Sequence, residues 1–111
     1  MSAQPAPDAA AVPVRVAIPQ QLRTLAGVAS SEVVVQAATP LTVRSCLDAL
    51  ETTHPTLVGT VRDRGTGRRR PMIRIYADGE DLSDEPPDTR LPARVTDGAE
   101  PLRLVGAIAG G

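Results

Sequence analysis

Hydrophobic residues stand at every second position near the start of the chain. In residues 12–18, VPVRVAI, valine and isoleucine alternate with proline, arginine and alanine. A period of two predicts a β-strand with one buried face. The β-branched segment SEVVVQA, residues 31–37, predicts a second strand, which we expect to be the hairpin partner of the first. Gly27 breaks the chain in the short connection between them.

A helical pattern follows Thr42. This residue suits the N-cap position, although the residues after it lack the full capping box. Apolar positions then recur at helical spacing on one side while charged positions face away: Val43, Cys46, Leu47 and Leu50 against Arg44, Asp48 and Glu51. Pro55 ends the helix, because the residue before a proline is pushed out of the α region. A further short helical turn is expected within residues 57–61.

The second half of the chain alternates between loops and strands. Residues 62–71, RDRGTGRRRP, predict a basic, solvated loop, and MIRIYADGEDL predicts a strand that reaches a tight turn at Asp78-Gly79. The proline-rich segment SDEPPDTRLPARV predicts a crossing loop. A second Asp-Gly pair, residues 97–98, then precedes a final strand at residues 101–105.

This order of elements predicts an α+β domain in which a mixed sheet packs on one main helix. We expect the domain to span residues 12–105, between a disordered tail at residues 1–11 and a flexible tail at residues 106–111. A chain of 111 residues is sufficient for one domain. Because it holds no Phe or Trp and one Tyr, Tyr76, its core must be aliphatic.

The charge and the first residues of the chain indicate no binding to nucleic acid or membrane. The formal net charge is −1, so no overall field steers the protein to a polyanion. The N-terminal segment has no basic region and is broken by prolines, unlike a signal peptide. No apolar stretch approaches the length of a membrane span. We expect a cytoplasmic protein that is a monomer when free.

Side chains that often carry catalysis or bind metals are scarce. His54, the only histidine, stands beside Pro55 and predicts a capping or surface role. Cys46, the only cysteine, lies on the apolar side of the helix and is expected to be structural. No metal site is expected, since zinc needs further ligands. One acidic group could bind a cation but fits a solvated loop better: Glu80, Asp81, Asp84, Glu85 and Asp88.

The basic loop carries five arginines, namely Arg62, Arg64, Arg68, Arg69 and Arg70. Nucleic-acid binding would require aromatic stacking platforms among these charges, and the segment has none. An inert solvated loop is the favoured interpretation. Docking to an acidic partner protein is the alternative.

The chain ends GAIAGG, residues 106–111. Because glycine has no side chain, the carboxylate of Gly111 can thread a narrow channel and approach the α-phosphate of ATP, and Gly110 extends this freedom by one residue. Six extended residues span about 20 Å, enough to reach a buried active site. A pKa of roughly 3.3–3.7 keeps the carboxylate ionised at neutral pH. These features favour a reactive C-terminus that needs no trimming.

Several motifs in this order resemble the ubiquitin-like sulfur carriers of the MoaD/ThiS type. They are VRVAIP followed by QLRTLAG, TVRSCLDALETTHP with Leu57 after it, IRIYADGEDL, the DTRL and DGAE segments, and the terminal GG. The resemblance covers residues 12–111 and implies a β-grasp fold. The basic loop before IRIYADGEDL resembles the cysteine-biosynthesis carriers (CysO-like) most.

The resemblance implies a carrier and not an enzyme. A ubiquitin-activating-type enzyme would use ATP to adenylate Gly111, and a sulfide or persulfide donor would convert the adenylate to a thiocarboxylate for a sulfur-accepting synthase. No cofactor would be bound to the carrier itself. The activating enzyme would contact the tail and an aliphatic patch near it: Ala107, Ile108, Ala109, Leu102, Leu104 and Val105.

Three alternatives remain open. They are the small subunit of molybdopterin synthase, a ubiquitin-like protein modifier, and an interaction module that never uses its C-terminus. The chain also departs from the family pattern. Gly106 stands where relatives commonly have proline, Asp78 replaces a usual asparagine, and Pro101 lengthens the DGAE connection. The last departure leaves the register of the final strand open.

Overall fold

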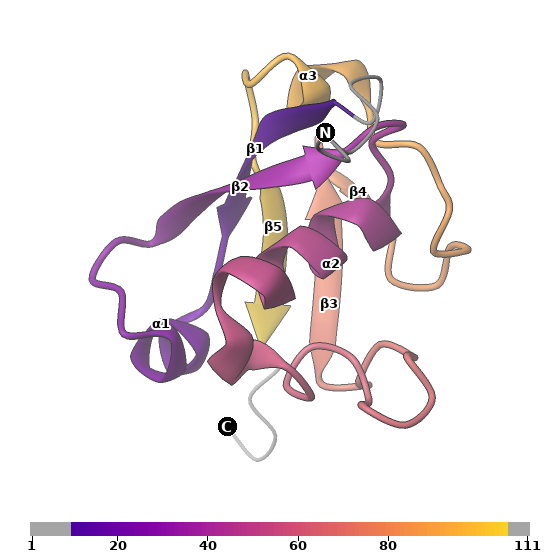
Figure 1. The fold of residues 1–111 in the computed structure, drawn as a ribbon. Coiled ribbons are helices and arrows are strands. Elements are labelled where there is room, and N and C mark those ends of the chain that lie inside the picture. Colours follow the sequence, from indigo (N-terminus) through magenta and orange to yellow (C-terminus); the bar gives the residue numbers. More distant parts are fainter. Residues whose placement is uncertain (1–9, 107–111) are drawn as a thin grey trace, which may run out of the picture.

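The computed structural model describes residues 10–106, in which a five-stranded sheet packs on one long helix (Figure 1). The strands are β1 (Ala11–Ala17), β2 (Glu32–Ala38), β3 (Ile73–Ala77), β4 (Glu80–Asp81) and β5 (Leu102–Gly106). The helices are α1 (Gln20–Ala26), α2 (Val43–Thr53), the 3-10 turn η1 (Pro55–Leu57) and α3 (Ala93–Thr96). The predicted tails lie almost entirely outside the described residues, so this division of the chain stays a prediction.

The sheet has the order β2-β1-β5-β3-β4 and is mixed. β1 and β2 form the predicted antiparallel hairpin, with Val14 opposite Val35. β5 runs parallel to β1 and antiparallel to β3, so the last strand occupies the centre of the sheet. The turn between β3 and β4 has positive φ at Asp78 (49°) and Gly79 (81°), as the Asp-Gly pair predicts. This architecture confirms the predicted β-grasp fold.

Helix α2 begins with a complete capping box, which the sequence analysis did not expect. The Ser45 backbone N–H donates to Thr42 Oγ1, and the Thr42 N–H donates to Ser45 Oγ, both at 3.0 Å. The expectation was wrong because the serine hydroxyl does here what a Glu or Gln side chain usually does. At the other end His54 forms the C-cap and α2 ends before Pro55, as predicted. The short turn η1 begins at Pro55, two residues earlier than the turn expected within residues 57–61.

Two short helices lie in segments that the pattern left as connections. α1 follows Pro19 and ends at Gly27, whose φ of 73° is the left-handed conformation of a helix stop. It has seven residues and buries only Leu22, so hydrophobic periodicity could not identify it. α3 has four residues and begins inside the predicted crossing loop, whose last three residues it includes.

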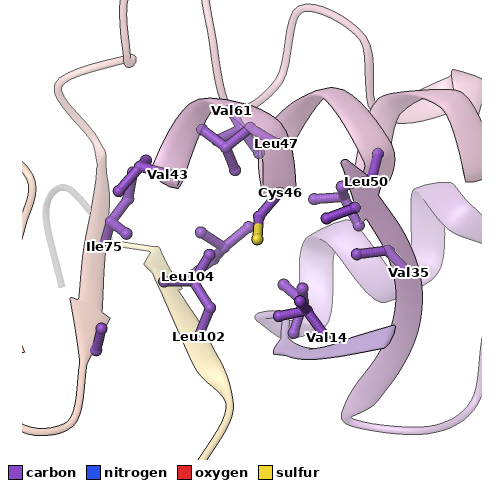
Figure 2. Packing of buried hydrophobic residues seen from close by; sticks show 14 of the residues in the cluster. Val14, Val35, Val43, Cys46, Leu47, Leu50, Val61, Ile75, Leu102 and Leu104 are labelled. Carbon is purple, nitrogen blue, oxygen red and sulfur yellow. The ribbon is translucent and has the colours of Figure 1, made fainter. Parts of the chain in front are cut away.

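The core fills the space between α2 and the inner face of the sheet (Figure 2). Among the described residues its buried members are aliphatic apart from one thiol, as the composition predicts. Cys46 is fully buried at the centre of this cluster. Burial raises the pKa of its thiol to about 12, since a low-dielectric interior disfavours the thiolate. These observations agree with the structural role expected for Cys46.

Candidate functional site

The chain leaves the domain from the central strand. Gly106, the last residue of β5, pairs with Ile73 at the start of β3. The predicted reactive residues, Gly110 and Gly111, lie outside the described residues. Ala107, Ile108 and Ala109, which were predicted to contact the activating enzyme, also lie outside them. Their roles stay predictions, and the site is described here by the surfaces that surround the end of β5.

The predicted aliphatic patch is only partly available to a partner. Leu102 and Leu104 are buried, at 0% and 3% exposure, so the expectation that they contact a partner is wrong. Alternate side chains of a strand point to opposite faces of the sheet, and these two point toward α2. Val105 points the other way and is 43% exposed. In the pairing of β5 with β3, Leu104 lies opposite Ile75 and Val105 lies opposite Arg74.

The outer face of the sheet around Val105 combines aliphatic and charged side chains. Val34 on β2 is a second exposed aliphatic residue on this face. Arg74 pairs with Asp81 at 2.6 Å. Hydrogen bonds from Ser83 and from Arg74 hold the pKa of Asp81 well below its usual range. The arginine is thus already neutralised, and Val105 lies beside paired charges.

A shallow cavity of about 430 Å³ lies between β5 and the connection from β1 to α1. Gln21 of α1, Val105 and Gly106 are among its lining residues. A Cβ atom at Gly106 would lie 3.3 Å from Gln21 Nε2. The glycine therefore lets the Gln21 side chain approach the last described residue closely.

Several other candidate residues form contacts within the fold. His54 donates its backbone N–H to Leu50 O at 2.8 Å. Three members of the acidic group are bound to arginines: Asp81 to Arg74, Asp84 to Arg69, and Asp88 to Arg44. Residues 10–106 hold no cluster of three or more His, Cys, Asp or Glu side chains that could bind a metal ion. Within the same range no helix has the length and apolar character to span a membrane.

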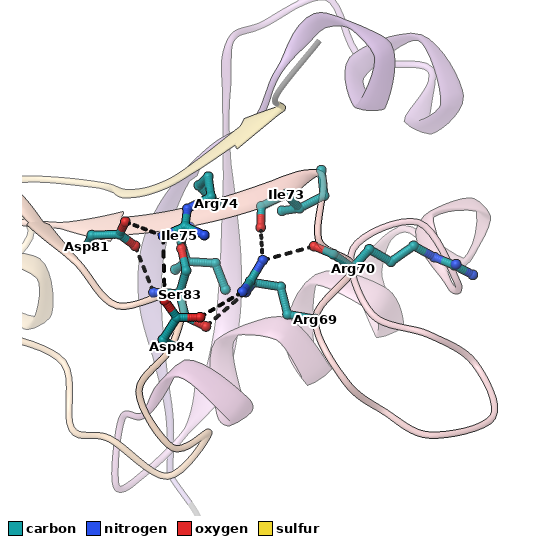
Figure 3. Close-up of polar contacts among 8 residues, drawn as sticks. All are labelled: Arg69, Arg70, Ile73, Arg74, Ile75, Asp81, Ser83 and Asp84. Carbon is teal, nitrogen blue, oxygen red and sulfur yellow. Dashed lines mark hydrogen bonds and ion pairs between the residues drawn. The ribbon is translucent and has the colours of Figure 1, made fainter. Parts of the chain in front are cut away.

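The expectation that the whole basic loop is solvated is wrong, because the side chain of Arg69 binds main-chain oxygens (Figure 3). The side chain is only 18% exposed. Its Nε donates to Ser83 O at 2.8 Å, and its Nη1 donates to Ile73 O at 2.8 Å and to Arg70 O at 3.0 Å. At Ile73 the edge of β3 extends beyond the two-residue strand β4, so the guanidinium binds a strand carbonyl that β4 does not reach.

Arg62 is held in a similar way on the other side of the loop. It donates to Glu51 Oε1 and Asp48 Oδ1, each at 2.8 Å, and so joins the loop to α2. The side chains of Arg62 and Glu51 are 17% and 18% exposed. Sequence reasoning missed both arginines as structural groups, because a run of charges carries no signal of which members are buried.

The chain resembles several solved structures in its fold. Neither the family models nor the curated proteins match the chain. SAMP1 from Haloferax volcanii is 26% identical over 89% of this chain and 99% of its own, with a TM-score of 0.69.

Two further solved structures share the fold. A chain of the Amycolatopsis orientalis BexX/CysO complex is 24% identical over 88% of this chain and 99% of its own, with a TM-score of 0.66. The small archaeal modifier protein 1 from Methanosarcina acetivorans is 19% identical over 91% and 98%, with a TM-score of 0.67. The chain is therefore similar to the ubiquitin-like sulfur carrier and modifier proteins of the MoaD/ThiS type, as its motifs indicated.

Proposed function

We propose that the protein is a ubiquitin-like sulfur carrier whose reactive group is the carboxylate of Gly111. The fold likeness to SAMP1 over 89% of the chain carries the proposal. It is supported by the exit of the chain from the central strand β5, which leads directly to the diglycine. The protein would serve as a cosubstrate, and the catalysis would belong to a separate adenylating enzyme.

The reaction would proceed in two steps at the carboxyl group of Gly111. A carboxylate oxygen of Gly111 attacks the α-phosphorus of ATP and releases pyrophosphate, which leaves an acyl adenylate. Hydrosulfide then attacks the acyl carbon; the C–S bond forms, the bond to the AMP oxygen breaks, and AMP leaves. The product is a thiocarboxylate. Adenylation is required because a carboxylate oxygen is a poor leaving group.

Glycine at the last two positions suits this chemistry. A side chain at either position would enlarge the cross-section of the segment that enters the enzyme's channel. The enzyme would bind the folded domain while the C-terminal carboxylate reacts. The resemblance of the basic loop and the IRIYADGEDL segment to the cysteine-biosynthesis carriers favours a cysteine-forming synthase as the acceptor, and the small-subunit role in molybdopterin synthase stays the alternative.

The test is the intact mass of the purified protein after incubation with its adenylating enzyme, ATP and sulfide. A thiocarboxylate adds the mass difference between sulfur and oxygen. The matched control is the chain without Gly110 and Gly111, which keeps the described domain and should gain nothing. No mass gain in the wild-type protein would refute the proposal.

A second candidate is a protein modifier that becomes joined to lysines of target proteins. The name of SAMP1, a small archaeal modifier protein at 25–26% identity, is the observation that favours it. Both candidates use the same adenylate, and they differ in the nucleophile that attacks it. Immunoblotting of cell extracts distinguishes them, because conjugation produces high-mass adducts that require Gly111.

A further inference from the structure

The exposed part of the basic loop is held in one shape by its own hydrogen bonds. Asp63 Oδ1 accepts the backbone N–H groups of Gly65 and Thr66, both at 2.9 Å. The Asp63 N–H donates to Arg68 O at 2.7 Å, and the Gly67 N–H donates to Asp63 O at the same distance. Bonds from Thr66 and Gly65 also lower the pKa of Asp63, so the anchor stays ionised near neutral pH.

Anchors on both sides fix this turn to the body of the protein. Arg62 binds the acidic side chains of α2, and Arg69 binds the edge of β3. Arg70 Nε donates to Gly59 O at 2.6 Å. A loop with these restraints loses little conformational entropy when a partner binds it.

Two arginines of the loop are left over from this network. Arg64 and Arg68 are exposed, and neither forms an ion pair with a carboxylate in residues 10–106. Arg62, Arg69 and Arg70 are each paired with at least one Asp or Glu. The loop therefore presents two unpaired positive charges on a chain whose formal net charge is −1.

The loop lies at the end of the sheet from which the chain exits (Figure 1). The Ile73 backbone N–H donates to Arg70 O at 3.0 Å, so the loop joins β3 through one tight turn. Ile73 is the residue paired with Gly106. An enzyme that works on the residues after Gly106 would therefore approach the same end of the molecule as the loop.

We propose that Arg64 and Arg68 form a preorganised docking surface for an acidic face of the adenylating enzyme, beside the channel that receives the tail. This inference rests on the proposed function, because it takes the enzyme to act at the residues after Gly106. The charges steer the encounter, and the rigid loop sets the orientation in which the tail meets the active site. Aliphatic contacts of Val105 would complete the interface on the other side of the exit.

The test compares charge variants of the whole chain in two assays with the adenylating enzyme. Binding without ATP is measured by calorimetry, and kcat/KM by ATP–pyrophosphate exchange, each at low and at high salt. The variants are R64E/R68E and the charge-conserving R64K/R68K. The singles R64E and R68E are compared with R94E, which reverses a charge on α3 at the opposite end of the sheet, where Arg94 pairs with Asp78 and Glu100 (Figure 1).

Reversal of both charges should lower the association constant and kcat/KM about tenfold at low salt, mostly through KM, and less at high salt. R64K/R68K should retain wild-type values. R64E and R68E should each lower the association constant and kcat/KM more than R94E does. If R64E/R68E lowers the association constant and kcat/KM no more than R94E does, the proposed docking surface is refuted. The proposed function would stay intact.

The two proposals fail in distinguishable ways. If the wild-type protein binds the enzyme but supports no exchange, the proposed function fails and the binding series still decides the role of the loop. If the wild-type protein does not bind the enzyme at all, both proposals are refuted. A melting temperature measured for each variant shows that the exposed substitutions leave the fold intact.

Discussion

Replacement of Arg69 by methionine tests whether this single guanidinium holds the basic loop to the sheet. Methionine keeps an unbranched stem of similar reach and removes every donor. Three hydrogen bonds to main-chain oxygens are lost, on Ser83, Ile73 and Arg70, together with an ion pair to Asp84 at 3.1 Å.

The magnitude follows from the burial of these groups. A hydrogen bond from a charged donor contributes about 1.5–3 kcal/mol when its partner cannot rehydrate. Water can reach part of this site, because the Arg69 side chain is 18% exposed, so the lower end of the range applies. The ion pair adds little, since Asp84 is 79% exposed. The bonds to Ser83 O and Ile73 O are part-buried and the bond to Arg70 O is exposed, so two contributions near the lower end of the range remain. We therefore expect R69M to lose about 2–3 kcal/mol of unfolding free energy.

The assay is urea denaturation followed by circular dichroism, supported by thermal melts. For a domain of this size each kcal/mol corresponds to a shift of roughly 5 °C, so the melting temperature should fall by about 10–15 °C. R68M is the matched control: it removes an exposed arginine without an ion partner in residues 10–106, and should change stability by less than about 0.5 kcal/mol. Equal stability of R69M and R68M would show that the Arg69 guanidinium does not hold the loop to the sheet.

Three further predictions concern the capping box, the buried thiol and the acidic end of β4. Thr42→Ala should cost about 1 kcal/mol in urea denaturation, because it leaves the Ser45 N–H without its acceptor, and a loss near zero would contradict the capping role. Cys46 should resist a thiol reagent at pH 8 in the native protein and react once urea unfolds it, since it is buried with a pKa of about 12; fast native labelling would contradict this. The pKa of Asp81 is lowered in the folded state, so its stabilisation is present above the ordinary aspartate pKa and is lost as the pH falls below that value. Acid titration of Asp81→Asn should therefore show a smaller loss of stability than the wild-type protein, and an identical profile would contradict the assignment.

The strands and α2 could be predicted because they follow strong periodic patterns. The strands predicted at residues 12–18 and 31–37 correspond to β1 and β2, which form the expected hairpin. The buried side of α2 includes Cys46 and Leu47, as expected. α1 could not be predicted from periodicity, since it makes two turns and buries one residue, although Gly27 was visible as a stop signal.

The candidate site was predicted less completely. Residues 101–105 were expected as a strand, but only the register shows that Leu104 faces the core and Val105 faces outward. The role of Arg69 depends on carbonyl groups of residues 73 and 83, which are distant in sequence. A single sequence does not reveal such contacts, because any of the five loop arginines could have made them.

The proposed function requires that sulfur is loaded at the last carboxylate of the chain. Arg103 is the last basic residue of the sequence, so a protease that cleaves after arginine releases residues 104–111 as one peptide, LVGAIAGG. Mass spectrometry of this peptide, after reaction with the adenylating enzyme, ATP and sulfide, locates the added mass. We expect an oxygen-to-sulfur exchange on the C-terminal residue, Gly111. An unmodified terminal peptide, or added sulfur found only at Cys46, would contradict it.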